Sequence, residues 1–334
     1  MRAAAILGLG TSIDDLKPFQ EGTNVEWVIG LPSDREAVDA TLIFGGDGTV
    51  HRHLGALVKL GLPVLVVPAG SGNDFARALG LEKIENSVVA WRKWTAGGQN
   101  LRAIDLGVIT TLSAPATPAD DAAQGYGART SLRTTVGNAN SLPMPEGAAS
   151  SLGSRSARER SYTYFSCAAG VGLDGEIARR ANAMPRWLRG HGGYALSLAP
   201  ALFAFQAFRL KLASAPSATT DSNPRWSEQT ALAAVFANTP VYGGGMRIAP
   251  RAKMDDGQLD ICLIRDISKL KLLAVFPSVY LGRHLGIRGV EYYSAGRVFV
   301  ETEQPMDVYA DGEYVCRTPV EVSVARAALR VVVR

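Results

Sequence analysis

Cysteine is scarce in this chain, and the few that occur lie far apart. Among 334 residues there are three, Cys167, Cys262 and Cys316, and no two of them form a CxxC pair. An odd number of cysteines without metal-ligand spacing argues against both a disulfide framework and a zinc ribbon. The sequence therefore favours a reducing, cytoplasmic environment.

Long apolar runs and dense basic runs are also missing. A helix needs about 20 apolar residues to span a bilayer, and the nearest approach, residues 192–208, is interrupted by Ser197, Pro200 and Gln206. We interpret this segment as a buried or interfacial helix. The formal net charge is +4 without any concentrated basic run, which argues against nucleic acid as a partner. So mild an excess fits either an anionic membrane surface or phosphate groups.

Residues 1–108 alternate strand and helix signals. Continuous apolar runs of strand length, separated by helical patterns, predict a parallel sheet covered on both faces. The first run is short and lacks a clear cleavage site, so we interpret it as a buried strand and not a signal peptide. The fold class that we expect is α/β plus β, beginning with a doubly wound, mostly parallel α/β domain. The expected strands are 3–10, 25–31, 40–46 and 62–70, and the expected helices are 50–61 and 73–81.

The rest of the chain changes character twice. Residues 111–160 are rich in Ala, Ser, Thr, Gly and Pro, which is typical of a flexible low-complexity insertion. Clear alternation later on predicts a C-terminal antiparallel β-sandwich over 161–325, with a helix at 268–284. The last strand, 326–334, is expected to return to the first domain. The other expected strands are 102–109, 161–175, 230–238, 257–264, 296–302, 305–313 and 319–325.

Two glycine-rich loops carry the clearest chemistry. Each follows a buried strand and precedes a helix, so backbone N–H groups and a helix N-terminus are available to phosphate. Both fall at the carboxyl ends of strands, where ligands of parallel sheets bind. Neither matches the GxxxxGK[ST] pattern, so backbone groups and a metal ion would have to hold the phosphates. The first loop comprises Gly45, Gly46, Asp47, Gly48 and Thr49, and the second Gly70, Ser71, Gly72, Asn73 and Asp74.

The carboxylates of these loops also have a purely structural interpretation. Asp47 and Asp74 would each suit a helix cap at a tight strand-to-helix turn. A carboxylate beside phosphates is repelled by them unless it binds a metal ion or a proton. Two such loops from neighbouring strands favour a ligand site, because we expect them to converge on one crevice.

Residues 170–175, GVGLDG, match the dinucleotide-binding pattern GxGxxG. Such a site needs an acidic residue about 20 positions further on, and none occurs between Ile177 and Thr220. We therefore reject a dinucleotide site here. Asp174 is left either as a contact to substrate or as part of a solvated helix start.

Taken in order, six segments resemble the motifs of the diacylglycerol kinase catalytic-domain family, which includes bacterial soluble lipid kinases and sphingosine and ceramide kinases. The likeness spans nearly the whole chain outside 111–160. It implies a two-domain, NAD kinase-like fold that uses ATP and Mg²⁺ to phosphorylate a lipid hydroxyl, in diacylglycerol or a related lipid alcohol or sphingoid base. The segments are GGDGT (45–49), PAGSGNDFARALG (68–80), IDLG (104–107), AAGVGLDGEIARR (168–180), ANTPVYGGGMRIAPRAKMDDGQLDICLI (237–264) and ADGE (310–313).

The resemblance implies roles for individual residues. Glu313 matches the position taken as the general base of bacterial members, and Asp105 matches another active-site carboxylate. The glycine loops would hold the nucleotide, and we add the hypothesis that Asp47 and Asp74 share a Mg²⁺ network. Asp174 would contact the lipid head group. A structural Mg²⁺ would be bound by Asp256 and Asp255 with backbone oxygens of Lys253 and Gln258.

The chain departs from the family pattern in three places. The first strand of the family usually ends in an Asn-Pro-x-x-Gly-like turn that helps to bind the nucleotide, and here Gly8, Gly10 and Thr11 take that place. His51 and Cys167 stand where the family commonly has asparagine. These changes bear on the adenine and ribose contacts and on the choice of substrate more than on the type of reaction.

Two other functions stay open, an NAD kinase-like small-molecule kinase and a non-catalytic nucleotide- or lipid-binding protein of the same fold. Basic side chains between residues 177 and 211, beside Trp187 and the apolar run, suit peripheral contact with the inner membrane face. A core helix with a solvated basic flank is the alternative, and a homodimer is also left open. The basic residues are Arg179, Arg180, Arg186, Arg189, Arg209 and Lys211.

Overall fold

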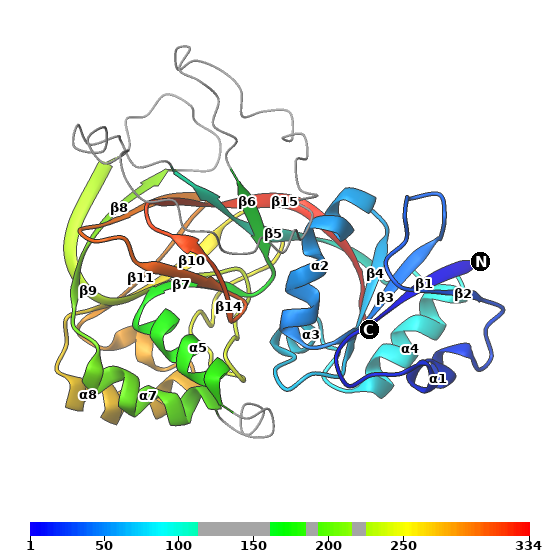
Figure 1. Ribbon diagram of the computed structural model, residues 1–334, viewed down its shortest axis with the longest axis horizontal. Coiled ribbons are helices and arrows are strands. Elements are labelled where there is room, and N and C mark those ends of the chain that lie inside the picture. Colours follow the sequence, from blue (N-terminus) through cyan, green and yellow to red (C-terminus); the bar gives the residue numbers. More distant parts are fainter. Residues whose placement is uncertain (113–160, 185–192, 216–224) are drawn as a thin grey trace, which may run out of the picture. The chain divides into compact units, whose positions relative to one another are not determined.

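The computed structural model describes residues 1–112, 161–184, 193–215 and 225–334 (Figure 1). The predicted insertion lies outside these residues from Ser113 onward. The same is true of three residues of the predicted membrane-contact segment, Arg186, Trp187 and Arg189.

The first half of the chain builds a parallel sheet, as predicted. Its strands pair in the order β2-β1-β3-β4, all parallel. Every residue of β3 and of β4 is buried, which explains why these strands read as continuous apolar runs. The strands are β1 (Arg2–Leu7), β2 (Glu26–Ile29), β3 (Ala40–Gly45) and β4 (Pro63–Pro68).

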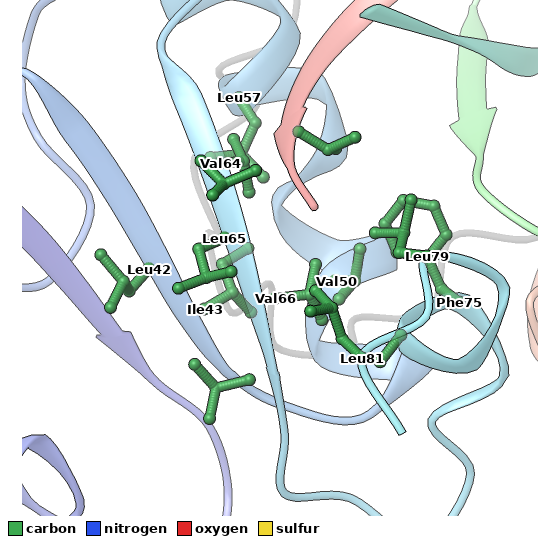
Figure 2. Packing of buried hydrophobic residues seen from close by; sticks show 14 of the residues in the cluster. Leu42, Ile43, Val50, Leu57, Val64, Leu65, Val66, Phe75, Leu79 and Leu81 are labelled. Carbon is green, nitrogen blue, oxygen red and sulfur yellow. The ribbon is translucent and has the colours of Figure 1, made fainter. Parts of the chain in front are cut away.

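Helices pack on this sheet through regularly spaced apolar side chains. Helix α2 buries Val50, Leu54 and Leu57 at helical spacing and ends at Gly61, whose φ of 59° closes the helix in the left-handed region. Figure 2 shows its side chains against those of β3 and β4. The helices of this half are η1 (Ile13–Leu16), α1 (Lys17–Gln20), α2 (Asp47–Leu60), α3 (Asp74–Ala78) and α4 (Ile84–Thr95).

The second half is antiparallel, as predicted from its alternating pattern. One strand, β15 (Val320–Val332), joins both halves: it pairs antiparallel with β12 and β5 and, through Arg330 and Val331, parallel with β4. A hydrogen-bonded path of strands is therefore continuous from β14 to β2. The remaining strands are β5 (Leu101–Thr111), β6 (Tyr162–Phe165), β7 (Ala168–Gly172), β8 (Phe208–Ala215), β9 (Arg225–Ala237), β10 (Leu259–Arg265), β11 (Val290–Ala295), β12 (Arg297–Thr302), β13 (Asp307–Ala310) and β14 (Glu313–Arg317).

Short helices accompany these strands, and three sequence predictions were wrong here. The strand expected at 161–175 is two strands, β6 and β7, and its last three residues begin a helix. The helix expected at 268–284 is divided at Phe276, because Pro277 starts a new helix. The strand expected at 305–313 ends at Ala310, so Glu313 begins the next strand. Among the described residues, no helix is long and apolar enough to cross a membrane. The helices are α5 (Leu173–Ala183), α7 (Gly193–Ala204), α8 (Lys269–Val275), α9 (Pro277–Tyr280) and η3 (His284–Gly286).

Candidate active site

The first glycine loop is the sharp connection between β3 and α2. Gly46 is the N-cap residue and Asp47 is the first residue of the helix, so Asp47 itself is not the cap. The Thr49 side chain fills the space beneath Gly45: a Cβ on that glycine would lie 2.6 Å from the Thr49 Oγ1. Only glycine fits at this position.

The loop after β1 lies beside the same threonine. A Cβ on Gly8 would lie 2.8 Å from the Thr49 Oγ1, and the Gly8 N–H donates to the Phe44 carbonyl over 2.7 Å. Gly10 has a φ of 87°, and the Thr11 hydroxyl closes the turn by donating to the Gly8 carbonyl over 2.8 Å. The predicted third nucleotide loop is thus adjacent to the first.

The two glycine-rich loops touch backbone to backbone. A Cβ on Gly46 would lie 2.9 Å from the Cα of Gly70, and a Cβ on Gly70 would overlap the Cα of Gly46. Asn73, with a φ of 69°, fixes the second loop because its amide accepts from the Gly70 N–H over 2.9 Å and donates to the Gly70 carbonyl over 2.8 Å. Ser71 at the tip is exposed. The structure therefore brings together the loops that the sequence singled out.

Asp47 binds the second loop directly. Its two carboxylate oxygens accept the N–H groups of Asp74 and Phe75 over 2.9 and 3.0 Å. Gly72 is required here, since a Cβ would lie 2.6 Å from the Asp47 Oδ2. Desolvation, followed by the charge of Asp74, raises the pKa of Asp47 to about 7. A bound cation would relieve this repulsion.

Asp74 is buried at the start of α3. One of its oxygens pairs with Arg77 one turn further on, and the other accepts the Gly244 N–H over 2.7 Å. The partner Gly244 is distant in sequence and lies on the turn before Met246. Asp74 therefore connects the second glycine loop to the second half of the chain.

Glu313 faces the first glycine loop from the opposite direction. A Cβ on Gly48 would lie 2.7 Å from the Glu313 Oε1, so this carboxylate occupies the space over the first turn of α2. It reaches this position because β13 and β14 form a hairpin whose turn residues, Asp311 and Gly312, have φ values of 50° and 83°. Its side chain is exposed.

Asp311 holds that hairpin turn in place. Its buried carboxylate accepts the N–H groups of Ser166 and Cys167 over 2.8 and 2.7 Å, and His51 of α2 lies 3.2 Å away. Burial lowers the pKa of His51, but the hydrogen bond and charge of Asp311, with the charge of Glu313, outweigh it and give a net rise. His51, which stands where the family commonly has asparagine, therefore joins α2 to the turn before Glu313.

Asp105 is buried and fully engaged by backbone. Its two carboxylate oxygens accept the N–H groups of Gly257 and Ala327, each over 2.7 Å. Its main-chain carbonyl accepts from the Asn238 side chain over 2.9 Å. These bonds join β5 to the loop before β10 and to the irregular part of β15.

The predicted structural metal loop lies beside Asp105. Asp255 pairs with Arg102 over 2.6 Å, and the exposed Asp256 accepts the Gln258 N–H over 3.0 Å. Arg102 competes with a cation for Asp255. In the described parts of the chain no three His, Cys, Asp or Glu side chains gather around one point, so a metal here would depend on Asp256 and on backbone oxygens such as those of Lys253 and Gln258.

An apolar pocket opens below Asp174 at the start of α5. At its polar end the Tyr242 hydroxyl donates to the Asp174 carboxylate. Burial raises the pKa of Asp174 to about 6, although the Tyr242 hydrogen bond opposes this. The other lining residues are apolar: Leu173, Ile177, Leu198, Ala233, Val235, Met246, Ile248, Ile264, Leu272, Phe276 and Val279.

Sequence reasoning missed three residues of this region. Asp311 lies in the family-like segment 310–313, and Tyr242 and Gly244 lie in the segment 237–264, but the sequence predicted no role for any of them. An acidic residue before a glycine predicts a turn, but it does not predict hydrogen bonds to Ser166 and Cys167, which are distant in the sequence. A tyrosine before three glycines does not indicate which side chain its hydroxyl will bind. Their roles come from pairing between distant segments.

Two family models match the chain. The diacylglycerol kinase catalytic domain matches residues 28–109, which hold both glycine loops. The YegS C-terminal NAD kinase beta sandwich-like domain matches residues 167–333, which hold the pocket and Glu313. Together they cover the two halves that share β15.

Similar proteins agree with these models. A diacylglycerol kinase of Mycobacterium tuberculosis is 30% identical over 302 residues, covering 89% of this chain and 77% of that protein. A diacylglycerol kinase of Bacillus subtilis is 22% identical, covering 83% of this chain and 71% of its own. A solved structure of a diacylglycerol kinase from Bacillus anthracis covers 100% of this chain and 97% of its own, with a TM-score of 0.60 at 17% identity, a likeness that bears on the fold alone.

The fold and the glycine loops define a kinase with a parallel α/β part and a C-terminal β-sandwich of the NAD kinase type, which confirms the predicted fold class. The chain belongs to the diacylglycerol kinase family, a family of lipid kinases, and it is an enzyme of that family.

Proposed function

We propose that this enzyme transfers the γ-phosphoryl group of ATP to a hydroxyl of a lipid, diacylglycerol or a related lipid alcohol or sphingoid base. The observation that carries the proposal is the position of the Glu313 carboxylate over Gly48, at the N-terminus of α2, where the two glycine loops meet. A helix N-terminus and adjoining backbone N–H groups suit phosphate, and a carboxylate beside them suits a base.

In the proposed reaction, Glu313 accepts the proton of the lipid hydroxyl as its oxygen forms a bond to the γ-phosphorus. The bond between the γ-phosphorus and the β,γ-bridging oxygen breaks, and ADP leaves. Backbone N–H groups around Gly46 and Gly70 stabilise the phosphate charge, since phosphoryl transfer depends mostly on positioning and electrostatics. Asp311, with its bonds to Ser166 and Cys167, keeps Glu313 in register with the loop.

The carboxylates fit a magnesium ion. Asp47 and Asp74 lie on touching loops, and the charge of Asp74 raises the pKa of Asp47. Two carboxylates with water and phosphate oxygens make a set of ligands that Mg²⁺ favours. When bound there, the ion would neutralise charge on the transferring phosphate. Asp47 would be its main ligand, because the Asp74 carboxylate is already paired with the Arg77 guanidinium, whereas Asp47 accepts backbone N–H groups.

The apolar pocket supports a lipid acceptor. Its apolar walls suit a hydrocarbon chain, and the Asp174–Tyr242 pair gives its polar end a site for a hydroxyl or head group. A water-soluble acceptor such as NAD would leave these apolar walls without a partner. The pocket therefore favours a lipid over the NAD kinase-like alternative.

Access from a bilayer is part of the proposal. Helices α7 and α8 carry Leu196, Phe203 and Leu270, which are 53%, 55% and 72% exposed, and Leu198 and Leu272 of the same helices line the pocket. The Lys269 ammonium donates to the Phe203 carbonyl over 2.9 Å, which places a cation beside this apolar surface. Apolar side chains flanked by cations suit an anionic membrane.

The basic residues predicted from sequence contribute less to that surface. Arg179 and Arg180 both pair with Glu176, and Arg209 and Lys211 both approach Glu228. Phe203→Asp should therefore weaken sedimentation with vesicles of phosphatidylglycerol and phosphatidylcholine more than neutralising Arg179 does. Val89→Asp, at a side chain of α4 that is 53% exposed, is the matched control. Equal vesicle binding by all three variants would contradict the proposal that this surface of α7 and α8 contacts a membrane.

The reaction is tested by incubating the enzyme with ATP labelled in the γ-phosphate and a total lipid extract. We expect a labelled lipid product that is missing with Glu313→Gln, and its identity names the acceptor. Labelled NADP in a parallel incubation with NAD would support the other kinase instead. ATP binding without any labelled product would support a non-catalytic protein.

A further inference from the structure

A glycine turn connects the two regions described above. Tyr242 and Met246 pair with each other across it, with backbone hydrogen bonds of 3.0 and 2.9 Å. Gly243, Gly244 and Gly245 have φ values of 61°, 86° and 95°. Three consecutive residues in the left-handed region make a turn that other residues adopt only with strain. Its shape therefore depends on all three glycines.

One side of this turn bonds to the nucleotide loops. The Gly244 N–H donates to the buried Asp74 carboxylate over 2.7 Å, and the Asp74 N–H in turn donates to Asp47 over 2.9 Å. The turn is thus two hydrogen bonds away from the first residue of α2. If Asp47 or Asp74 shifts when a nucleotide binds, these hydrogen bonds would move the backbone at Gly244.

The other side of the turn belongs to the acceptor pocket. Tyr242 and Met246 both line it, and the Tyr242 hydroxyl donates to Asp174. The Tyr242 ring also packs against the core clusters of both halves of the chain. One five-residue turn, 242–246, therefore contacts the second glycine loop through its tip and the pocket through its two ends.

We propose that Tyr242 positions Asp174 for the acceptor, and that the turn 242–246 couples nucleotide binding to the shape of the acceptor pocket. The inference rests on the proposed function and deepens it. It predicts that the nucleotide orders the pocket before the acceptor arrives, so that the two substrates favour each other's binding.

Hydrogen exchange with Mg²⁺ and adenylyl imidodiphosphate, a non-hydrolysable ATP analogue, tests the coupling without any lipid. In the wild type we expect slower exchange at the glycine loops and also at residues 242–248 and 173–177. Gly244→Ala should keep the loop response and lose the pocket response, because alanine strains the turn while its Cβ meets no neighbour.

Gly97→Ala is the matched control, since Gly97 is also exposed, has a φ of 87° and has no neighbour near a Cβ. It should respond as the wild type does. The coupling would be overturned, with the proposed function left standing, by either of two results. One is hydrogen exchange at the wild-type pocket that does not change when the nucleotide binds, and the other is a pocket response in Gly244→Ala equal to that of the wild type. No response even at the glycine loops would instead remove the proposed function.

A kinetic split tests the role of Tyr242. Tyr242→Phe keeps the ring and removes the hydroxyl, and a lost hydrogen bond to a charged group corresponds to about a tenfold effect. With the lipid that the wild type phosphorylates, we expect KM for that lipid to rise about tenfold while ATP affinity without lipid stays the same. Tyr293→Phe is the control, because the Tyr293 hydroxyl lies near Ser214 on β8 and not in the pocket. Its KM for the lipid should equal that of the wild type. An unchanged lipid KM in Tyr242→Phe would contradict the positioning role.

Discussion

Asp47 combines two functions at one residue, because it ties the glycine loops together and offers negative charge to a cation. Its raised pKa, about 7, follows from burial and from the charge of Asp74. A carboxyl whose pKa is higher in the folded state than in the unfolded state binds more protons when folded. Its contribution to stability is therefore complete at low pH and is lost as the pH rises.

The pH dependence of unfolding tests this assignment. Between the ordinary pKa of 3.8 and the folded value of about 7, the free energy of unfolding without ligands should fall more steeply with rising pH in the wild type than in Asp47→Asn. Mg²⁺ with a nucleotide should raise the melting temperature of the wild type more at pH 8 than at pH 6. Parallel pH profiles for the two proteins would show that Asp47 does not titrate in this range.

Glu313 is the residue on which the chemistry depends most. Glu313→Gln keeps the size of the side chain but removes the base, so kcat should fall by about 100-fold or more. Nucleotide affinity should stay within about twofold, roughly 0.4 kcal/mol, because the backbone of the loops is unchanged. Rapid-quench kinetics and equilibrium titration separate the two effects. If kcat keeps its wild-type value, the base is another group.

At the scale of elements, the contact between the two glycine loops sets the geometry. Residues 45–49 and 70–74 were recognised from sequence because glycines after buried strands have a clear physical meaning. The hairpin that carries Glu313 was not, since alternation alone does not reveal a turn at Asp311. The single helix predicted at 268–284 was wrong, because the apolar pattern continues across Pro277 although the backbone starts a new helix there.

Alanine at Gly70 tests the loop contact. Its Cβ would overlap the backbone of Gly46, which cannot move without displacing α2, so we expect a loss of about 2 kcal/mol in stability and a large loss of nucleotide affinity. Gly55→Ala, in the middle of α2 with no neighbour near a Cβ, should instead stabilise the protein by about 0.5–1 kcal/mol. Denaturant unfolding measures both. Similar behaviour of the two variants would mean that the loops do not depend on this contact.

At the scale of the whole molecule, β15 and the bonds around Asp105 join the two halves. The parallel and antiparallel parts were predicted from the burial pattern of their strands, because continuous and alternating apolar runs differ in the sequence itself. The register between distant strands was not, since β15 pairs with β5 along most of its length on one edge and with β12 and then β4 on the other. No local pattern records such partners.

Asp105→Asn tests whether that residue acts in folding or in chemistry. An amide can accept only one of the two N–H groups that Asp105 now binds, and it turns a donor toward the other. A stability loss of about 2–3 kcal/mol is expected, with kcat reduced by less than about tenfold at a temperature where the variant is folded. Normal stability with a much larger loss of kcat would assign Asp105 to the reaction itself.

The proposed reaction requires one triphosphate to lie where the two glycine loops meet Glu313. A crystal structure of the wild type with Mg²⁺ and adenylyl imidodiphosphate measures this most directly. We predict that the β- and γ-phosphates contact the backbone of residues 46–49 and 70–73, with the γ-phosphate facing Glu313. Phosphates bound elsewhere, with these loops empty and Glu313 facing solvent, would contradict the account.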